Sequence, residues 1–221
     1  MLLRDNYAST SYGGALVTGI GVARVWNSTF SGNSAEETGG AISAFGTLYL
    51  THVTIANNDT APGRAGGVTL SSEGFLHLRN SIIGDNSGVQ CEVVAPWGVD
   101  AYGSVSSDST CGVTTSQAGN IVADPLLGPL AINGGNSLTH ALLVGSPALD
   151  RGRAQFCLFI DQRGYQRPID GDNDGVARCD AGAFEYKSTG PPPGVSGLWH
   201  AKMPGAPLLP KPTGGGREPG R

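Results

Sequence analysis

The chain has 221 residues, of which 35 are glycine, and charged residues make up only 14%. This composition excludes a coiled coil and a charge-driven disordered chain. A net charge of -4 offers no basic surface for a nucleic acid. No apolar run approaches the roughly 20 residues of a membrane span, and the N-terminus shows no signal peptide. We therefore expect a chain that acts as a monomer, without nucleic acid and without a membrane span.

Glycine pairs recur through the first third of the chain, at Gly13-Gly14, Gly39-Gly40 and Gly66-Gly67. A second element recurs in phase with them and reads "ARVWNSTFSGN", "LYLTHVTIANN" and "LHLRNSIIGDN". The order of the elements is the same in all three units, which indicates an internal repeat of roughly 26 residues.

Within each unit, apolar and polar residues alternate, and then a turn follows. Val25, Leu50 and Leu78 hold one aligned position, while Phe30 and Ile55 hold another. Period two predicts short strands with one buried face. Stacked units of this length predict an all-β, right-handed, single-stranded parallel β-helix of the pectin lyase-like type. An antiparallel β-sandwich is the alternative, but it would not explain the in-phase glycines and asparagines.

The repeats and the changes in composition divide the chain into three segments. Residues 1–123 hold the repeats and begin within a unit, so we expect further coils upstream. After Asn86 the repeat becomes less regular, so we expect Ser87–Gly112 to form a degenerate coil with a longer loop. Residues 124–186 predict a C-terminal cap that hides the last edge of the stack. Residues 187–221 hold all three lysines and 8 of the 14 prolines, which predicts a disordered tail.

The four cysteines form an even set, for which two local pairs are the simplest arrangement. These pairs are Cys91–Cys111 and Cys157–Cys179, and they would suit an oxidising compartment. Four unpaired cysteines remain the alternative. Zinc is disfavoured because the sequence has no C-x-x-C motif and no histidine beside a cysteine.

The motifs "FSGN" and "GGAI" resemble the repeats of polymorphic outer membrane proteins. The segments "ADPLLGPLAINGGNSLTHALLVGSPALDRG" and "DQRGYQRPIDGDNDGVARCDAGAFEY" are similar to bacterial choice-of-anchor Q domain proteins, which also occur among CSLREA-type surface proteins. Ile55 and Ile83 depart from the pattern, since they replace the phenylalanine. The resemblance implies a secreted or surface-displayed right-handed β-helix, and it implies no known enzyme activity.

The segment "DGDNDG" matches the first half of a calcium-binding loop. Asp170, Asp172 and Asp174 alternate, so their carboxylates can converge on one hard cation, and Asp180 stands near the position of the closing acidic ligand. The motif predicts Ca²⁺ that rigidifies the cap, and a solvated acidic turn is the alternative. Nearby arginines and an aspartate predict internal salt bridges: Arg163, Arg167 and Asp161.

Two outward columns of the repeat combine aromatic and basic side chains. Such side chains on a flat sheet predict contact with a glycan, although ordinary exposed decoration of strands is the alternative. The candidate residues are Arg24, Trp26, Tyr49, His77 and Arg79. The sequons at Asn27 and Asn58 coincide with repeat turns, so we expect a structural role for both.

No catalytic constellation is evident in the sequence. The acidic residues of the repeats are scattered, and His52 falls in the column of Asn27 and Asn80, which indicates a turn residue. We therefore expect a non-enzymatic, extracellular or cell-surface protein, adhesin-like or glycan-contacting, whose partners are surface glycans or cell-surface proteins. The alternative is a carbohydrate-active lyase or hydrolase whose active site lies in upstream coils.

Overall fold

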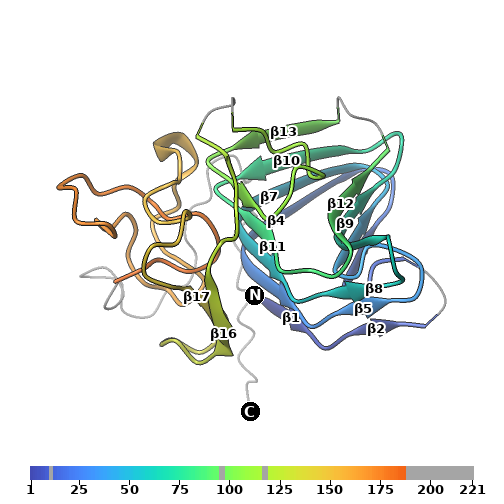
Figure 1. Cartoon of the computed structure of the whole chain (residues 1–221), viewed down its shortest axis with the longest axis horizontal. Coiled ribbons are helices and arrows are strands. Elements are labelled where there is room, and N and C mark those ends of the chain that lie inside the picture. The colour runs from blue at the N-terminus through green and yellow to red at the C-terminus, as the bar shows by residue number, and fades with distance from the viewer. Residues whose placement is uncertain (10–11, 95–97, 116–118, 188–221) are drawn as a thin grey trace, which may run out of the picture.

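The computed structural model describes residues 1–9, 12–94, 98–115 and 119–187. Within them the chain is all-β apart from one 3₁₀ turn, η1 (Ala154–Phe156). Parallel strands stack into a β-solenoid of about four turns, as Figure 1 shows. The predicted parallel β-helix is confirmed. The three predicted sequence units correspond to successive turns, because each strand pairs with its equivalent in the next unit.

The largest sheet runs along two sides of each coil. Its longest strands are β4 (Val22–Ser31) and β7 (Thr47–Ala56), which pair in parallel over their whole length. The other members, in chain order, are β1 (Leu2–Arg4), β10 (Phe75–Arg79), β11 (Ile82–Gly84), β13 (Val99–Tyr102), β14 (Val105–Ser106) and β15 (Ile121–Val122).

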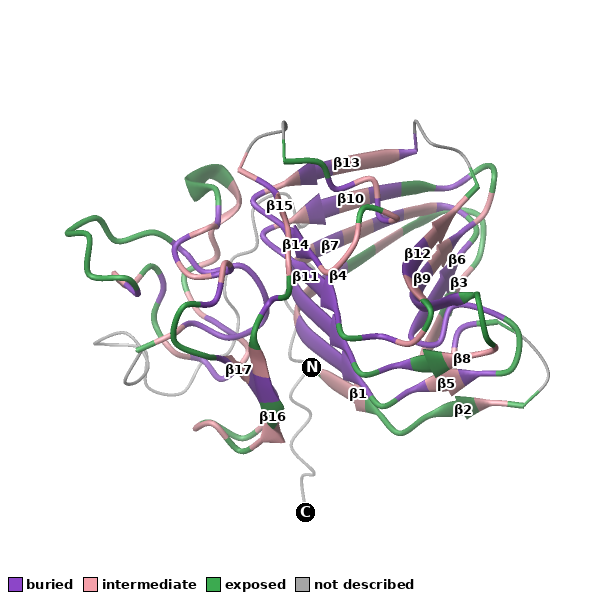
Figure 2. Cartoon of the chain, viewed as in Figure 1, coloured by how far each residue is buried: buried purple, intermediate pink, exposed green. Residues whose placement is uncertain are grey.

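Two smaller parallel sheets close the coil. One contains β3 (Leu16–Thr18), β6 (Ile42–Ala44), β9 (Ala65–Leu70) and β12 (Val89–Val93). The other contains β2 (Tyr7–Ala8), β5 (Ser34–Ala35) and β8 (Asp59–Thr60). Their inward side chains, with those of the large sheet, form the core seen as purple ribbon in Figure 2. Phe30, Ile55 and Leu50 are fully buried in it.

An asparagine ladder runs through the turn that follows the large sheet. Asn6 donates from Nδ2 to Oδ1 of Asn33, Asn33 donates to Asn58, and Asn58 donates to Asn86, each at 2.8 Å. Gln90 accepts the last bond of the series at 2.7 Å. Because the buried amides satisfy one another from coil to coil, the predicted asparagine columns are confirmed.

The C-terminal edge of the stack is covered by the loop that follows β14. Cys111 and Val113 are fully buried in the main core. The free backbone N–H of Gln90 donates to Asp108 Oδ2, and that of Cys91 donates to Thr110 Oγ1, both at 3.0 Å. Side chains of this loop thus replace the backbone acceptors that a further strand would supply.

The segment predicted as a terminal cap, residues 124–186, lies instead along one flank of the coils (Figure 1). It opens with an antiparallel hairpin, β16 (Leu127–Ala131) and β17 (Thr139–Leu142), and continues mostly as irregular backbone. Outward-facing Ile82 and Val105 explain this position, because they bury against Leu142 and Phe184 and need an apolar cover. We call residues 124–186 the flanking segment.

Both predicted disulfides are present, Cys91–Cys111 with a Cα–Cα distance of 4.7 Å and Cys157–Cys179 with 6.0 Å. The first ties β12 to the loop that covers the stack, and the second closes a loop of the flanking segment. Lys187 is the last described residue, so the rest of the predicted tail lies outside the described part of the chain.

None of the helices in the described residues is long and apolar enough to cross a membrane.

Candidate functional site

Outward side chains of the large sheet form a stacked column across three coils. The guanidinium of Arg24 lies 4.7 Å from the ring centre of Tyr49, and the Tyr49 ring stacks on His77 at 4.2 Å with an interplanar angle of 12°. Parallel pairing of β4, β7 and β10 sets this alignment, since Arg24, Tyr49 and His77 occupy one register position. The structure therefore brings these three predicted residues together.

The C-terminal end of this column is engaged within the protein. Oδ2 of Asp100, in β13, lies 3.3 Å from Nδ1 of His77, and the same carboxylate forms an ion pair with Arg79. The side chain of Arg79 is only 12% exposed and lies against the rings of both Tyr102 and Phe156, at 4.7 and 4.8 Å from their centres. Partial burial opposes ionisation of Asp100, but the hydrogen bonds and charges of Arg79 and His77 hold the pKa of Asp100 below its ordinary value.

Arg24 and Trp26, the two predicted glycan-contact residues of β4, lie at the N-terminal end of the stacked column. Arg24 is exposed, and Trp26 is half-buried two residues further along β4. In the next coil the small side chain of Thr51 aligns with Trp26. Arg24, Trp26 and Tyr49 together offer a cation, an indole and a phenol at the surface, and we call these three residues the outward face.

A second group of polar side chains lies in the flanking segment. Carboxylate oxygens of Asp150, Asp170 and Asp172 lie within 4.8 Å of one another. Asp150 accepts the backbone N–H of Asp172 at 2.8 Å and is buried. Burial, and in smaller part the charge of Asp172, raises the pKa of Asp150 above its ordinary value. Oδ1 of Asp170 is a buried atom with no hydrogen-bond partner in the described structure.

The other two predicted metal ligands lie outside this group. Asp174 pairs with the guanidinium of Arg178 at 2.8 Å, four residues further along. Asp180 is fully buried and accepts the backbone N–H groups of Asp150 at 2.8 Å and Tyr186 at 2.6 Å. Sequence reasoning missed Asp150, because it stands 20 residues before the acidic motif and only the fold brings it there.

Buried ion pairs hold the interior of the flanking segment. Arg163 pairs with Asp161 at 2.7 Å, and Arg167 pairs with Glu185 at 2.8 Å, with side chains that are 3% exposed or less. The predicted internal salt bridges are thus confirmed for both arginines. Asp180 joins the group through its backbone N–H, which donates to Glu185. Burial, and next the nearby Glu185, raises the pKa of Asp180 to about 8.

The column of Asn27, His52 and Asn80 forms the corner of the large sheet. All three residues adopt positive φ, at 42°, 51° and 49°, so the predicted turn role is confirmed. Their side chains also dock the flanking segment, since Asn27 donates to the carbonyl of Ile160 at 2.8 Å and Asn80 donates to that of Arg153 at 3.1 Å. The alternation in sequence gave no signal of this second role.

The two sequon asparagines therefore serve the fold. The amide of Asn27 is bonded to the flanking segment. Asn58 is 1% exposed and sits inside the asparagine ladder, where its amide donates to Asn86. The expected structural role is confirmed for both residues.

A serine and a histidine meet between β4 and β17. Oγ of Ser31 lies 2.9 Å from Nε2 of His140, and Nδ1 of His140 lies 2.8 Å from the carbonyl oxygen of Gly128. This is the geometry of a nucleophile and its base. Ser31 is only 4% exposed and His140 only 1%, so neither side chain is open to a substrate. The contact is a hydrogen bond between the coils and the flanking segment.

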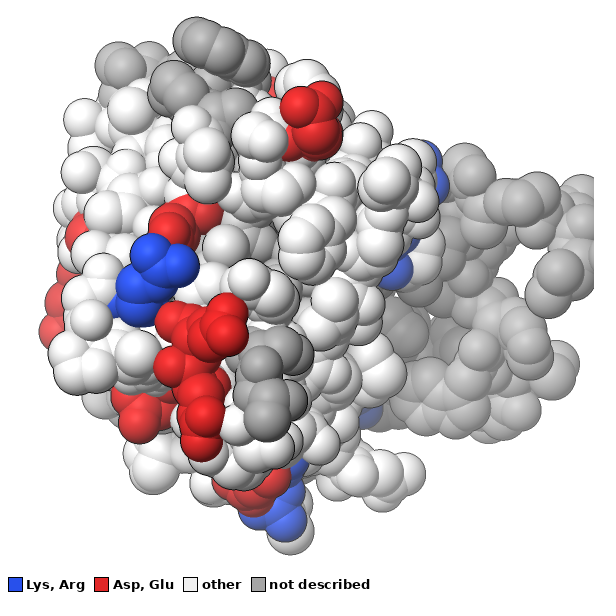
Figure 3. Space-filling view, turned by 90° about the vertical axis from the view of Figure 1, so that its right-hand side faces the viewer, with Lys and Arg blue, Asp and Glu red and all other residues white. Residues whose placement is uncertain are grey.

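Charged side chains are sparse over the surface. Figure 3 shows a group of acidic and basic side chains on one face, with a few further charged side chains near its edges and uncharged residues over most of the rest. Among the described residues, Arg64 and Glu92 form one exposed ion pair at 3.0 Å.

No family model, no curated protein and no solved structure matches this chain.

Proposed function

We propose that the chain is a non-enzymatic β-helix module of an extracellular or cell-surface protein, and that it contacts a glycan through the outward face. The observation that carries this proposal is the column of Arg24, Tyr49 and His77 on parallel strands. Successive coils lie about 4.8 Å apart, so the column offers a regular series of contacts to an extended polymer.

The chemistry of the outward face favours an acidic sugar chain. Tyr49 has both ring faces covered, one by Arg24 and one by His77, so it presents its edge and hydroxyl. The guanidinium of Arg24 supplies charge-assisted hydrogen bonds to a carboxylate, and Trp26 supplies apolar surface. His77 and Arg79 contribute less to binding, because Asp100 engages both.

Location and mode of action are part of the same proposal. The two disulfides fit a compartment outside the reducing cytoplasm. The resemblance to choice-of-anchor Q and polymorphic outer membrane proteins supports an adhesin-like role at a bacterial surface. The buried state of Ser31 and His140 supports a role in binding, without catalysis by this pair.

A glycan array tests this proposal. We expect the chain to bind acidic glycans ahead of neutral ones, and Arg24→Ala to weaken that binding about tenfold, because a charge-assisted hydrogen bond contributes roughly 1.5–3 kcal/mol. Arg64→Ala is the matched control, since Arg64 is an exposed arginine on another side of the coil. Equal binding by both variants, or release of new sugar ends by the wild-type chain, would contradict the proposal.

We also propose that one Ca²⁺ binds the flanking segment through Asp150, Asp170 and Asp172. Three carboxylates within 4.8 Å repel one another, and a hard cation that prefers oxygen ligands would offset this repulsion. The unpartnered Oδ1 of Asp170 supports the same set. Asp174 is omitted because it pairs with Arg178.

Thermal unfolding with and without EDTA tests the calcium proposal. We expect EDTA to lower Tm by several degrees, since a ligand at 100 times its Kd stabilises by roughly 2.7 kcal/mol. Asp172→Asn should abolish this shift, because it removes one of the three converging carboxylates. Asp59→Asn, at an exposed aspartate of β8, is the matched control and should keep the shift. An identical Tm in EDTA and in calcium for the wild-type chain would refute the site.

A further inference from the structure

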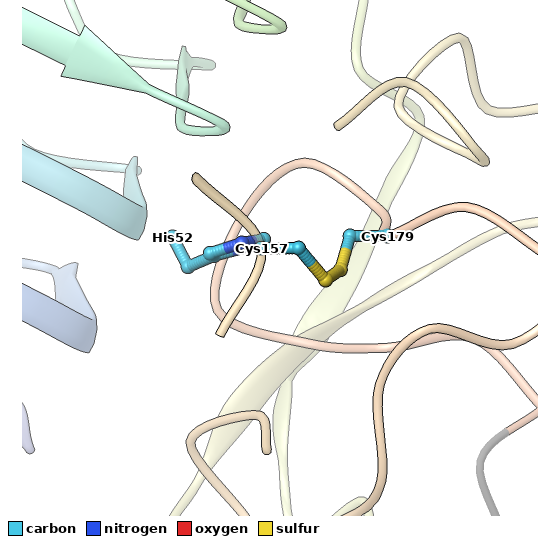
Figure 4. Close-up of side chains that lie close together, drawn as sticks. All are labelled: His52, Cys157 and Cys179. Atoms are coloured by element: carbon cyan, nitrogen blue, oxygen red, sulfur yellow. A yellow bond between two sulfur atoms is a disulfide. The ribbon is translucent and has the colours of Figure 1, made fainter. Parts of the chain in front are cut away.

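A histidine and two cysteines that lie far apart in sequence meet where the coils contact the flanking segment. His52 stands at the corner of β7, Cys157 follows η1, and Cys179 precedes the buried Asp180. One ligand atom of each lies within 4.8 Å of the others. Figure 4 shows the imidazole pointing at the two sulfur atoms, which the structure joins as a disulfide.

The surroundings of His52 prepare one ring nitrogen to act as a ligand. Nδ1 lies 3.3 Å from the carbonyl oxygen of Gly182, which can only accept, so Nδ1 carries the proton. Nε2 lies 3.1 Å from the amide of Asn80 and keeps its lone pair. Histidines that bind metals commonly donate their other N–H to a backbone carbonyl in this way. Burial, and next the charge of Arg167, lowers the pKa of His52 well below its ordinary value.

A groove of about 710 Å³ reaches the cysteines from outside. Both Cys157 and Cys179 line it, together with Arg153 and Arg178. Positive side chains near a thiol favour the thiolate, which is the form that binds metal. The groove also leaves room for a fourth ligand, as in zinc sites with three protein ligands and one open position.

We propose that reduction of the Cys157–Cys179 disulfide creates a site for one zinc-class cation, bound by Sγ of both cysteines and Nε2 of His52. Tetrahedral zinc with Zn–S bonds of about 2.3 Å separates its ligand atoms by roughly 3.5–3.8 Å. The imidazole already lies within 4.8 Å of both sulfur atoms, and these two atoms move apart once the disulfide is reduced. This inference goes beyond the proposed function and does not depend on it.

The chemistry balances with a dithiol as reductant. The dithiol gives two electrons and two protons to the disulfide, which becomes two thiols, and the dithiol becomes a cyclic disulfide. Binding of Zn²⁺ then releases the two thiol protons to solvent, and two thiolates neutralise the two charges of the ion. Asn80 turns its amide away from Nε2 when the metal takes that lone pair.

The second disulfide offers a comparison within the same molecule. Cys91 and Cys111 are 2% and 0% exposed and lie in the apolar core. Cys157 is partly exposed and lines the groove, so a small reductant reaches this pair first. The sequence argument against zinc weighed only neighbours along the chain, whereas 105 residues separate His52 from Cys157.

Cobalt titration of the full chain tests the site. The chain is reduced under native conditions, the freed thiols are mapped by alkylation, and Co²⁺ is added without oxygen. We expect the free thiols to be Cys157 and Cys179, and one Co²⁺ to bind with tetrahedral d–d bands and thiolate charge-transfer absorption, which Zn²⁺ then abolishes. The oxidised chain should show neither signal.

His52→Asn is the matched variant, because Asn27 and Asn80 hold the same corner in the neighbouring coils. We expect it to keep the fold and to bind Zn²⁺ at least about tenfold more weakly, since even outer-shell changes cost 10–100-fold. If the variant does not fold, comparison of the reduced and oxidised wild-type chains decides alone. Unchanged affinity in His52→Asn, no thiolate absorption in the reduced chain, or equal binding by the oxidised chain would overturn the proposal.

Discussion

At the scale of single residues, the fold is held by buried polar groups that complete one another. The amide of Asn58 donates to Asn86 and to the carbonyl of Phe30, and its Oδ1 accepts from the backbone and the amide of Asn33. A buried donor or acceptor without a partner costs roughly 1–3 kcal/mol, so the middle of the ladder tolerates change poorly.

Asn58→Ala should therefore lower the free energy of unfolding by about 3–4 kcal/mol, because it leaves groups of both neighbouring asparagines without partners. Urea denaturation measures the change. Asn57→Gly is the matched control: Asn57 is exposed, has φ of 57°, and aligns with Gly32 of the preceding coil. The control should change stability by less than about 0.5 kcal/mol. A loss below about 1 kcal/mol in Asn58→Ala would show that the ladder contributes little.

A second residue-scale prediction concerns pH. Burial and Glu185 raise the folded-state pKa of Asp180 to about 8, from an ordinary value of 3.8. The folded chain thus binds a proton that the unfolded chain releases, so this group stabilises the fold most fully below about pH 4. Its contribution should decline as the pH rises from about 4 to about 8.

Thermal unfolding across this pH range, for the wild-type chain and for Asp180→Asn, isolates the contribution of Asp180. The variant is expected to be less stable overall, because one backbone N–H of Asp150 or Tyr186 loses its acceptor. The difference between the two curves should shrink as the pH rises. A difference that is constant from pH 4 to pH 8 would show that Asp180 stays ionised throughout.

At the scale of elements, close approach of neighbouring coils explains the recurrent glycines. Gly39 has φ of +67° and turns the chain into β6. Gly40 has no room for a side chain, because a Cβ there would lie 2.6 Å from the carbonyl oxygen of Gly66 and still closer to that of Asp59. The first glycine of the pair is thus required by a positive φ, and the second by the lack of space for a side chain.

Gly40→Ala should destabilise the chain by about 1–3 kcal/mol, the usual range for overpacking against groups that cannot move. Gly19→Ala is the control, since a Cβ at Gly19 would meet nothing within 4 Å. That control should be neutral or slightly stabilising. Chemical denaturation of the two variants gives the comparison, and equal stability would refute the steric argument.

How much the sequence predicted differs between the repeats and the flanking segment. The period of the repeats revealed the strands, the inward column of Phe30 and Ile55, and the asparagine ladder, because equivalent residues recur in each coil. The flanking segment has no period. Its contacts, such as Asp150 with Asp172 and His52 with Cys179, join residues far apart along the chain, and only folding reveals them.

The position of the flanking segment was also beyond sequence reasoning. The loop at Cys111 and Val113 already covers the end of the stack. The outward apolar side chains of Ile82 and Val105 leave the flank as the surface to be covered. In the sequence these two residues read as ordinary strand positions, because alternation shows that a face is apolar and does not show what packs on it.

At the scale of the whole molecule, the β-helix has one flank that the rest of the chain covers and one face that it leaves open. One flank is covered by residues 124–186, which dock on the corner column of Asn27, His52 and Asn80. The outward face of Arg24, Trp26 and Tyr49 lies on the first half of the long strands β4 and β7, before that corner. We therefore propose that the uncovered face contacts the glycan, whereas the covered flank contributes to stability.

One NMR titration tests the proposed function most directly. The chain labelled with ¹⁵N is titrated with an acidic oligosaccharide, an oligogalacturonate, and the indole signal is assigned with Trp26→Phe. We predict saturable shifts of the Trp26 indole and the Arg24 guanidinium, with the oligosaccharide recovered intact. Saturable shifts confined to residues 124–186, with Trp26 and Arg24 unmoved, would contradict the proposed function, and so would cleavage of the sugar.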